Sequence, residues 1–226
     1  MGINIFNKNL KIYRNRKEVN ELNYFKFIPE NYITLKKNVI KKMGLPKGTI
    51  LFCLNTNCTN ALLLCFKVND EISMPFDDVQ SVIDSLHDSM DDNTGIIEVS
   101  TATTKLRKKI IYTIIKHKKQ VYNDLQFGVE YTLNLNIKVN DEVWLINGSF
   151  CEEGITGYRD NIIYTTVMEN INLNNPFDEW MYDPYDKNYI QGYLMNISEK
   201  PEYDLMFPEH PLSELRGYIK YIIENN

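Results

Sequence analysis

The chain of 226 residues is poor in the residues that build metal and redox sites, with only four cysteines and three histidines. Cys53, Cys58 and Cys65 follow a C-x4-C-x6-C spacing that matches no zinc or iron–sulfur motif, and Cys151 stands apart from them. No two histidines are four residues apart, so the H-E-x-x-H pattern is also missing. We therefore expect no metal, no cofactor and four reduced thiols in a reducing compartment.

Long apolar segments are missing as well. The longest run, Ala61–Phe66, is far shorter than the roughly 20 residues that a membrane-spanning helix needs. Residues 1–10 contain neither the charged start nor the apolar core of a secretory signal. These features predict a cytoplasmic protein without a membrane partner.

The charge pattern does not favour nucleic-acid binding. The formal net charge is −5, and residues 172–226 carry ten Asp or Glu against four Lys or Arg. Because this acidic quarter would repel a phosphate backbone, we expect a protein partner, basic if charged, and no nucleic acid. We interpret the lysines of residues 105–119 as gatekeepers that keep apolar strand edges from aggregating.

The clearest pattern in the chain lies in residues 129–168. Apolar and polar residues alternate over 129–139, which is typical of a strand with one buried face. Asn140-Asp141 predicts a tight turn into a partner strand over 143–150. A loop with two glycines then leads into a helix over 158–170.

Further strands and helices are indicated elsewhere. Apolar residues at helical spacing, with Asp77 or Asp78 as a cap and Gly44 as a stop, predict helices over 76–90 and 32–43. Another helix is expected over 211–223, where a proline suits the first turn. Runs of strand-forming residues predict strands over 10–13, 22–28, 49–54, 61–68, 96–102 and 109–116.

Together these elements predict an α+β fold. Residues 1–171 would form a mostly antiparallel sheet flanked by helices on both faces, an α/β/α sandwich. Residues 172–226 would form an acidic extension, rich in Tyr and Trp, that ends in a helix. We expect this extension to pack on the main domain, because so many aromatic rings would not stay in water.

The order of elements over residues 22–171 resembles that of the PsbP/DcrB-like family of α/β/α sandwiches. The local features that carry the resemblance are Phe27-Ile28-Pro29-Glu30 and the late strand, acidic loop and helix of residues 150–160. Members of this family are mostly adaptors, chaperones and accessory subunits. The resemblance therefore implies a binding role, and it implies no catalytic residue.

Cys151 is the best candidate for a nucleophile, because a loop and a helix follow it. Catalysis would also need an orienting carboxylate and a nearby histidine. The histidines are His87, His117 and His210. Glu152 and Glu153 would raise the pKa of the Cys151 thiol, which opposes activation. A small hydrolase or transferase that uses Cys151, or a set of Tyr, Asp and His, is therefore an alternative.

The start of the helix at residue 158 offers four further candidate site residues. Its glycine loop, residues 154–157, resembles a cradle for an anion, but Glu152 and Glu153 would occupy the place of that anion. We interpret these two carboxylates as residues that favour the helix dipole. Arg159 and Asp160 are expected to form local ion pairs.

The acidic aromatic stretch of residues 177–193 is the most unusual composition in the chain. Tyr and Trp often anchor interfaces, and neighbouring carboxylates would steer a basic partner. The candidate partner-binding residues are Trp180, Tyr182, Asp183, Tyr185, Asp186 and Tyr189. The alternative interpretation is that this stretch covers a sheet edge and buries its rings there.

We therefore predict a non-catalytic protein-binding module, a chaperone, immunity or accessory protein beside a bacterial toxin or secretion system. The partner would lie on the open face of the sheet or on the acidic aromatic stretch. The small enzyme is the first alternative, and a structural component of a larger assembly is the second.

Overall fold

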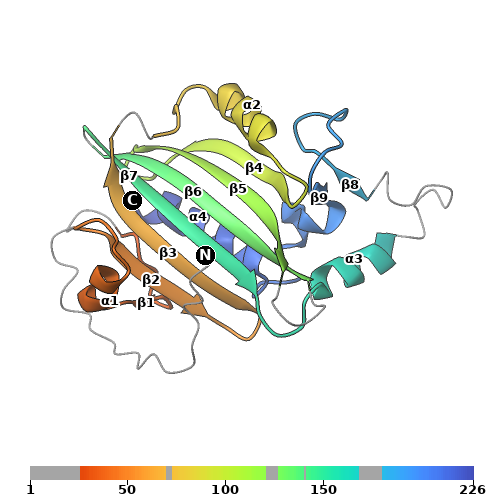
Figure 1. Cartoon of the computed structure of the whole chain (residues 1–226), viewed down its shortest axis with the longest axis horizontal. Helices are drawn as coiled ribbons and strands as arrows, with labels where there is room; N and C mark the ends of the chain where they lie inside the picture. Colours follow the sequence, from red (N-terminus) through yellow and green to blue (C-terminus); the bar gives the residue numbers. More distant parts are fainter. Residues whose placement is uncertain (1–25, 70–72, 121–126, 140, 168–179) are drawn as a thin grey trace.

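A large antiparallel sheet dominates the structure. The computed structural model describes residues 26–69, 73–120, 127–139, 141–167 and 180–226. Seven strands in the order β1-β2-β3-β7-β6-β5-β4 form the main sheet, and β8 and β9 form a small pair beside it (Figure 1). The predicted α+β class with a mostly antiparallel sheet is thus confirmed.

The elements follow one another as the sequence suggests for most of the chain. The main strands are β1 (Ile33–Thr34), β2 (Ile50–Asn55), β3 (Thr59–Val68), β4 (Thr94–Thr103), β5 (Lys109–Gln120), β6 (Phe127–Val139) and β7 (Glu142–Glu152). The small sheet pairs β8 (Met181–Tyr182) with β9 (Met195–Asn196). The helices are α1 (Lys37–Lys42), α2 (Val79–Ser89), α3 (Tyr158–Val167) and α4 (Pro211–Asn225), with short 3-10 turns η2 (Ile197–Glu199) and η3 (Pro201–Tyr203).

The predicted hairpin of residues 129–150 is present as β6 and β7 in the middle of the sheet. Val139 pairs with Glu142, and the register continues to Glu130 opposite Cys151. Every second residue of β6, from Tyr131 to Ile137, is fully buried on one face. The period-two pattern therefore identified the buried face correctly.

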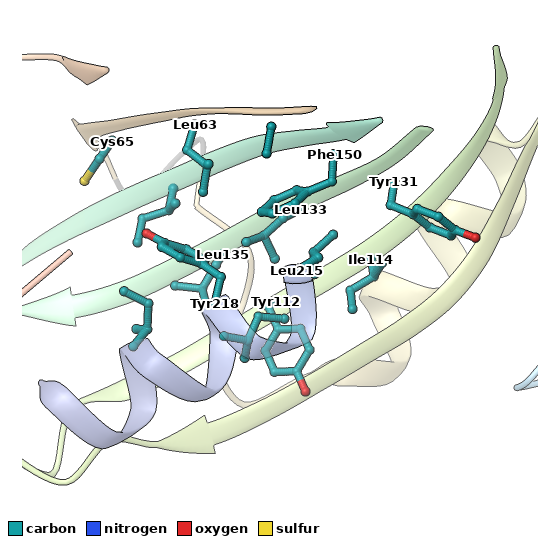
Figure 2. Packing of buried hydrophobic residues seen from close by; sticks show 14 of the residues in the cluster. Leu63, Cys65, Tyr112, Ile114, Tyr131, Leu133, Leu135, Phe150, Leu215 and Tyr218 are labelled. Atoms are coloured by element: carbon teal, nitrogen blue, oxygen red, sulfur yellow. The ribbon is translucent and has the colours of Figure 1, made fainter. Parts of the chain in front are cut away.

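α4 covers that buried face. Leu212, Leu215 and Ile219 of the helix belong to the same apolar cluster as the inward-facing residues of β3, β5, β6 and β7. Figure 2 shows Leu215 and Tyr218 among Leu133, Leu135 and the other buried side chains of the sheet. Burial of this many large side chains supplies most of the favourable free energy of folding.

The opposite side of the sheet, here called the outer face, carries the residues that alternate with the α4-facing ones. α2 packs on it at one end, where Val82 and Ile83 contact the cluster of Ile96, Val99 and Ile111. The neighbouring part of the outer face is more polar, because β6 and β7 place amide and hydroxyl side chains there. These side chains are Thr132, Asn134, Asn136, Asn147 and Ser149.

Three expectations about local structure need correction or limits. The helix expected over 32–43 begins only at Lys37, because Ile33 and Thr34 pair with β2 as β1. Residues 26–28 are not a strand, and the rest of the expected strand 22–28, like that at 10–13, lies outside the described residues. Asp78, and not Asp77, caps α2 by accepting the N–H of Ser81 at 3.0 Å.

The gatekeeper interpretation of the lysines is wrong for β5. This strand lies between β4 and β6 and is not a sheet edge. Lys116 is fully buried, with its Nζ 2.9 Å from the Glu199 carboxylate.

None of the helices in the described part of the chain has the length and apolar character that a membrane span requires.

Candidate functional site

A groove of about 380 Å³ lies between α2 and the outer face of the sheet. Its floor is formed by Thr113 of β5, by Asn134 and Asn136 of β6 and by Leu145 of β7. Its wall comes from α2 and from the two residues Met74 and Pro75 ahead of it. Eleven of the described residues line the groove, and all eleven side chains are uncharged.

Helical spacing explains the wall. Ser81, Ser85 and Ser89 follow one another at intervals of four, so they form one stripe along α2. Val82 and Leu86 form a parallel apolar stripe next to the serines. The wall therefore presents hydroxyl groups and apolar groups side by side.

Strand register explains the floor. Thr113 lies opposite Asn134, and Asn134 lies opposite Asn147, so these polar side chains form one row across three strands. In the next row on the same face, Asn136 lies opposite Leu145. Two asparagines of β6 thus stand side by side beneath α2.

The two floor asparagines differ in how their amides are satisfied. Asn134 accepts a hydrogen bond at 2.7 Å from the Nδ2 of Asn147 through its side-chain oxygen. Asn136 is only 1% exposed, and its Nδ2 has no hydrogen-bond partner among the described residues. Since an unsatisfied buried donor costs about 1–3 kcal/mol, this amide marks a place where a ligand acceptor would be favourable.

The described part of the acidic aromatic stretch, residues 180–193, lies elsewhere, against β4, α2 and α3. Trp180 is buried and packs edge-on against Tyr164 of α3, with ring centroids 5.0 Å apart. Asp183 is also buried, accepts the backbone N–H groups of Tyr185 and Asp186, and lies 3.1 Å from Nε2 of His87.

The tyrosines of this stretch contact the sheet edge and α2. The Tyr185 hydroxyl accepts the N–H of Val99 at 2.5 Å and donates to the carbonyl of the same residue at 3.1 Å. Tyr189 stacks on His87 with ring centroids 4.2 Å apart. The Nζ of Lys200 lies over the ring of Tyr182, 5.9 Å from the ring centroid. These contacts match the interpretation in which the stretch covers a sheet edge, and partner binding by it stays a prediction.

Three of the four candidates at the start of α3, namely Glu152, Arg159 and Asp160, take part in buried or partly buried polar contacts. Glu152 accepts the backbone N–H groups of Gly157 and Val129 at 3.0 and 3.2 Å. Burial alone would raise the pKa of Glu152, but His210, 3.7 Å away, and these N–H groups outweigh burial and lower it. Glu153 is exposed beside it.

Arg159 and Asp160 contact residues far along the chain. Arg159 is 1% exposed and pairs with Asp204 at 3.0 Å, so the expected local ion pair is wrong for this residue. Asp160 accepts the hydroxyl proton of Ser198, and burial together with the nearby Glu199 raises the pKa of Asp160. Both residues hold the turns η2 and η3 against α3.

A buried ion pair next to this region was missed by sequence reasoning. Lys116 of β5 pairs with Glu199, which also accepts the Tyr131 hydroxyl at 2.8 Å. The ring of Tyr193 lies 4.0 Å from the Lys116 Nζ. The available signal was register, because Lys116 has the same parity along β5 as the inward-facing Ile114.

Cys151 is buried on the outer face of β7. Its Sγ lies 3.0 Å from the Nζ of Lys119 and 3.6 Å from the hydroxyl of Ser149, which donates to Glu130. Burial raises the pKa of the Cys151 thiol despite the nearby ammonium group. A neutral thiol is a poor nucleophile, so this environment does not favour the enzyme alternative.

The histidines do not complete a catalytic set in the described structure. His87 contacts Asp183 and Tyr189, and His210 contacts Glu152 and the ring of Tyr131. His117 lies opposite Glu130 in the register of β5 and β6. None of the contacts found among the described residues joins a histidine to Cys151.

No protein-family model matches this sequence, and no curated protein matches it. The fold and the groove define the class only as an α+β protein with a neutral groove beside its sheet. Function has to be inferred from that groove and from the face on which it lies.

Proposed function

We propose that this protein is a non-catalytic, cytoplasmic binding module that holds a protein partner on the outer face of its sheet, in the groove beside α2. The observation that carries the proposal is the buried, unpartnered amide of Asn136 in the floor of a neutral groove. A site built from amides, hydroxyls and apolar groups is suited to holding a ligand by shape and hydrogen bonding.

The surroundings of the groove also support a protein partner. Leu62, Leu64 and Phe66 of β3 are half-buried on the same outer face, in register with β7. Leu145 joins this apolar strip to the groove floor. A mixture of apolar and polar area is the usual make-up of protein–protein interfaces.

The remaining parts of the proposal come from the sequence. The resemblance to adaptor and accessory proteins favours a chaperone, immunity or accessory role beside a bacterial toxin or secretion system. In this proposal helices jacket both faces of the sheet, and residues 172–226 form the docked acidic extension. The exposed carboxylates of that extension, such as Asp186, would then steer a basic part of the same partner.

The test is a partner-capture experiment with a blocked groove. The tagged protein, its Ser85→Trp variant and its Gln80→Trp variant are crosslinked in native lysate, and the captured partner is purified and titrated against each. Ser85 lines the groove, whereas Gln80 is an exposed residue of the same helix outside the lining. We expect Ser85→Trp to weaken binding at least about tenfold and Gln80→Trp to leave it unchanged.

Two results would contradict the proposal. One is a protein that captures no partner, and the other is a partner that binds Ser85→Trp as tightly as the unchanged protein. Melting temperatures of both variants serve as the folding control, because both substitutions are at exposed helix positions.

A further inference from the structure

We infer that the groove beside α2 recognises an uncharged amide group of its partner, a peptide bond or a side-chain carboxamide within a short neutral segment. The part of this inference that assigns the amide to a protein rests on the proposed function. The chemistry of the recognition follows from the lining of the groove alone.

The floor supplies a hydrogen-bond donor. The Nδ2 of Asn136 is buried and has no acceptor among the described residues. Its neighbour Asn134 receives a hydrogen bond from Asn147, and among the described contacts no hydrogen bond joins the amides of Asn134 and Asn136. A ligand carbonyl placed over Asn136 would remove the cost of the unpaired donor.

The wall supplies hydrogen-bond acceptors. The Ser81 hydroxyl donates its proton to the Asp78 carbonyl, and the Ser89 hydroxyl donates to the Leu86 carbonyl. A serine hydroxyl that has donated its proton still has a lone pair, so each oxygen can accept an N–H. The groove therefore places a donor on one side and acceptors on the other, which is the complement of an amide.

The neutral lining selects against ions. A carboxylate or ammonium group in this groove would lose water without gaining an opposite charge from any of the eleven lining residues that the structure describes. Val82, Leu86 and Leu145 offer apolar contacts for the carbon atoms that flank an amide. The volume, about 380 Å³, is at the small end of ligand sites, so a short segment fits better than a long one.

The experiment uses a matched pair of probes. N-acetyl-leucine N-methylamide is neutral and carries two amides, whereas N-acetyl-leucinate has nearly the same shape but ends in a carboxylate. Each is titrated into the full chain while the side-chain amide signal of Asn136 is followed by NMR. We expect a saturable shift with the neutral probe and binding of the carboxylate at least about fivefold weaker.

Two variants assign the signal to the groove. Asn136→Leu removes the donor together with the NMR signal that reports binding, so the affinity of this variant is measured by calorimetric titration. Ser85→Phe fills the groove from the exposed face of α2, and each variant should bind the neutral probe about tenfold more weakly or worse. Gln80→Phe is the control and should bind as the unchanged protein does. Asn136 is buried, so its substitution can prevent folding. In that case Ser85→Phe, at an exposed position, still tests the inference.

The inference is overturned by equal binding of the two probes or by a shift that never saturates. It is also overturned if glucose, a neutral molecule without an amide, is titrated in the same way and binds as tightly as the neutral probe. Its failure differs from failure of the proposed function. If a captured protein partner is sensitive to Ser85→Trp but the neutral probe does not bind, the amide specificity is wrong and the binding module stands. If the neutral probe binds and no partner is captured, the groove recognises amides but the protein-partner proposal is wrong.

Discussion

Asn136 and Asn147 show how the same side chain can weaken or strengthen the fold at neighbouring strands. Asn136 buries an unpaired donor, whereas Asn147 donates to Asn134 at 2.7 Å and to the Leu133 carbonyl at 3.4 Å. We predict that Asn136→Leu raises the free energy of unfolding by about 1 kcal/mol and that Asn147→Leu lowers it by about as much. Denaturant titration of both variants is the check, and a loss of stability in Asn136→Leu would mean that its amide has a partner.

Glu152 should make stability depend on pH. Its pKa is lowered below 4.5, so its ionised form stabilises the folded state at neutral pH. That contribution is complete above the unfolded-state pKa and is lost as the pH falls through the folded-state pKa. We predict that Glu152→Gln costs about 1 kcal/mol at pH 7 and that the gap to the unchanged protein narrows as the pH falls through the lowered folded-state pKa of Glu152.

The measurement is chemical unfolding of both proteins between pH 3 and pH 7, with Glu153→Gln as the matched control. Glu153 is exposed, so its substitution should change stability by less than about 0.5 kcal/mol. A gap between Glu152→Gln and the unchanged protein that stays constant over this pH range would contradict the prediction.

Among the elements, β4 is an edge strand that needs cover. Unpaired N–H and C=O groups on such an edge invite pairing with other chains. The Tyr185 hydroxyl bonds both groups of Val99, and Tyr193 donates its N–H to the Thr94 carbonyl at 2.8 Å. Gly95 permits this approach, because a Cβ there would lie 1.9 Å from the Tyr193 carbonyl oxygen.

Removing one hydroxyl tests this cover. We predict that Tyr185→Phe lowers the free energy of unfolding by about 1 kcal/mol and speeds hydrogen exchange at the Val99 amide about fivefold. Hydrogen exchange followed by NMR gives both numbers. Tyr158→Phe, at another exposed ring, is the control, and equal exchange of Val99 in the two variants would show that Tyr185 does not protect the edge.

Elements with a strong local pattern were predictable from the sequence. The β6–β7 hairpin and α4 have alternating or helical apolar spacing and suitable turn or cap residues, so local preference and tertiary packing agree. The predicted start of α1 was wrong, because Ile33 and Thr34 pair with β2 and form a strand. That pairing is a tertiary contact, which no local window contains.

The groove could not be predicted in the same way. Its lining comes from α2, the two residues ahead of it and the strands β5, β6 and β7, so the groove exists only after all three strands have paired beside α2. In the sequence Asn136 is one of several polar residues on the alternating strand. Only the folded structure shows that its amide is buried without a partner while that of Asn147 is satisfied.

At the scale of the whole molecule, the sheet separates two faces with different roles. The face under α4 holds the large apolar cluster, and the outer face holds the groove. Leu215 is fully buried in the cluster, so Leu215→Ala should lower the free energy of unfolding by about 2–5 kcal/mol. It should leave the affinity of the folded protein for N-acetyl-leucine N-methylamide unchanged within about twofold, because Leu215 and the groove lie on opposite faces of the sheet.

Ser85→Phe should show the opposite pattern, with weaker probe binding and an unfolding free energy changed by less than about 0.5 kcal/mol, because Ser85 is exposed. In the double variant the two effects should add within about 0.5 kcal/mol, since the substituted side chains lie on opposite sides of the sheet. Calorimetric titration and denaturant unfolding of the four proteins measure both quantities. A coupling energy well above 0.5 kcal/mol would mean that the sheet transmits strain between its faces, and that binding in the groove and packing of α4 are one cooperative event.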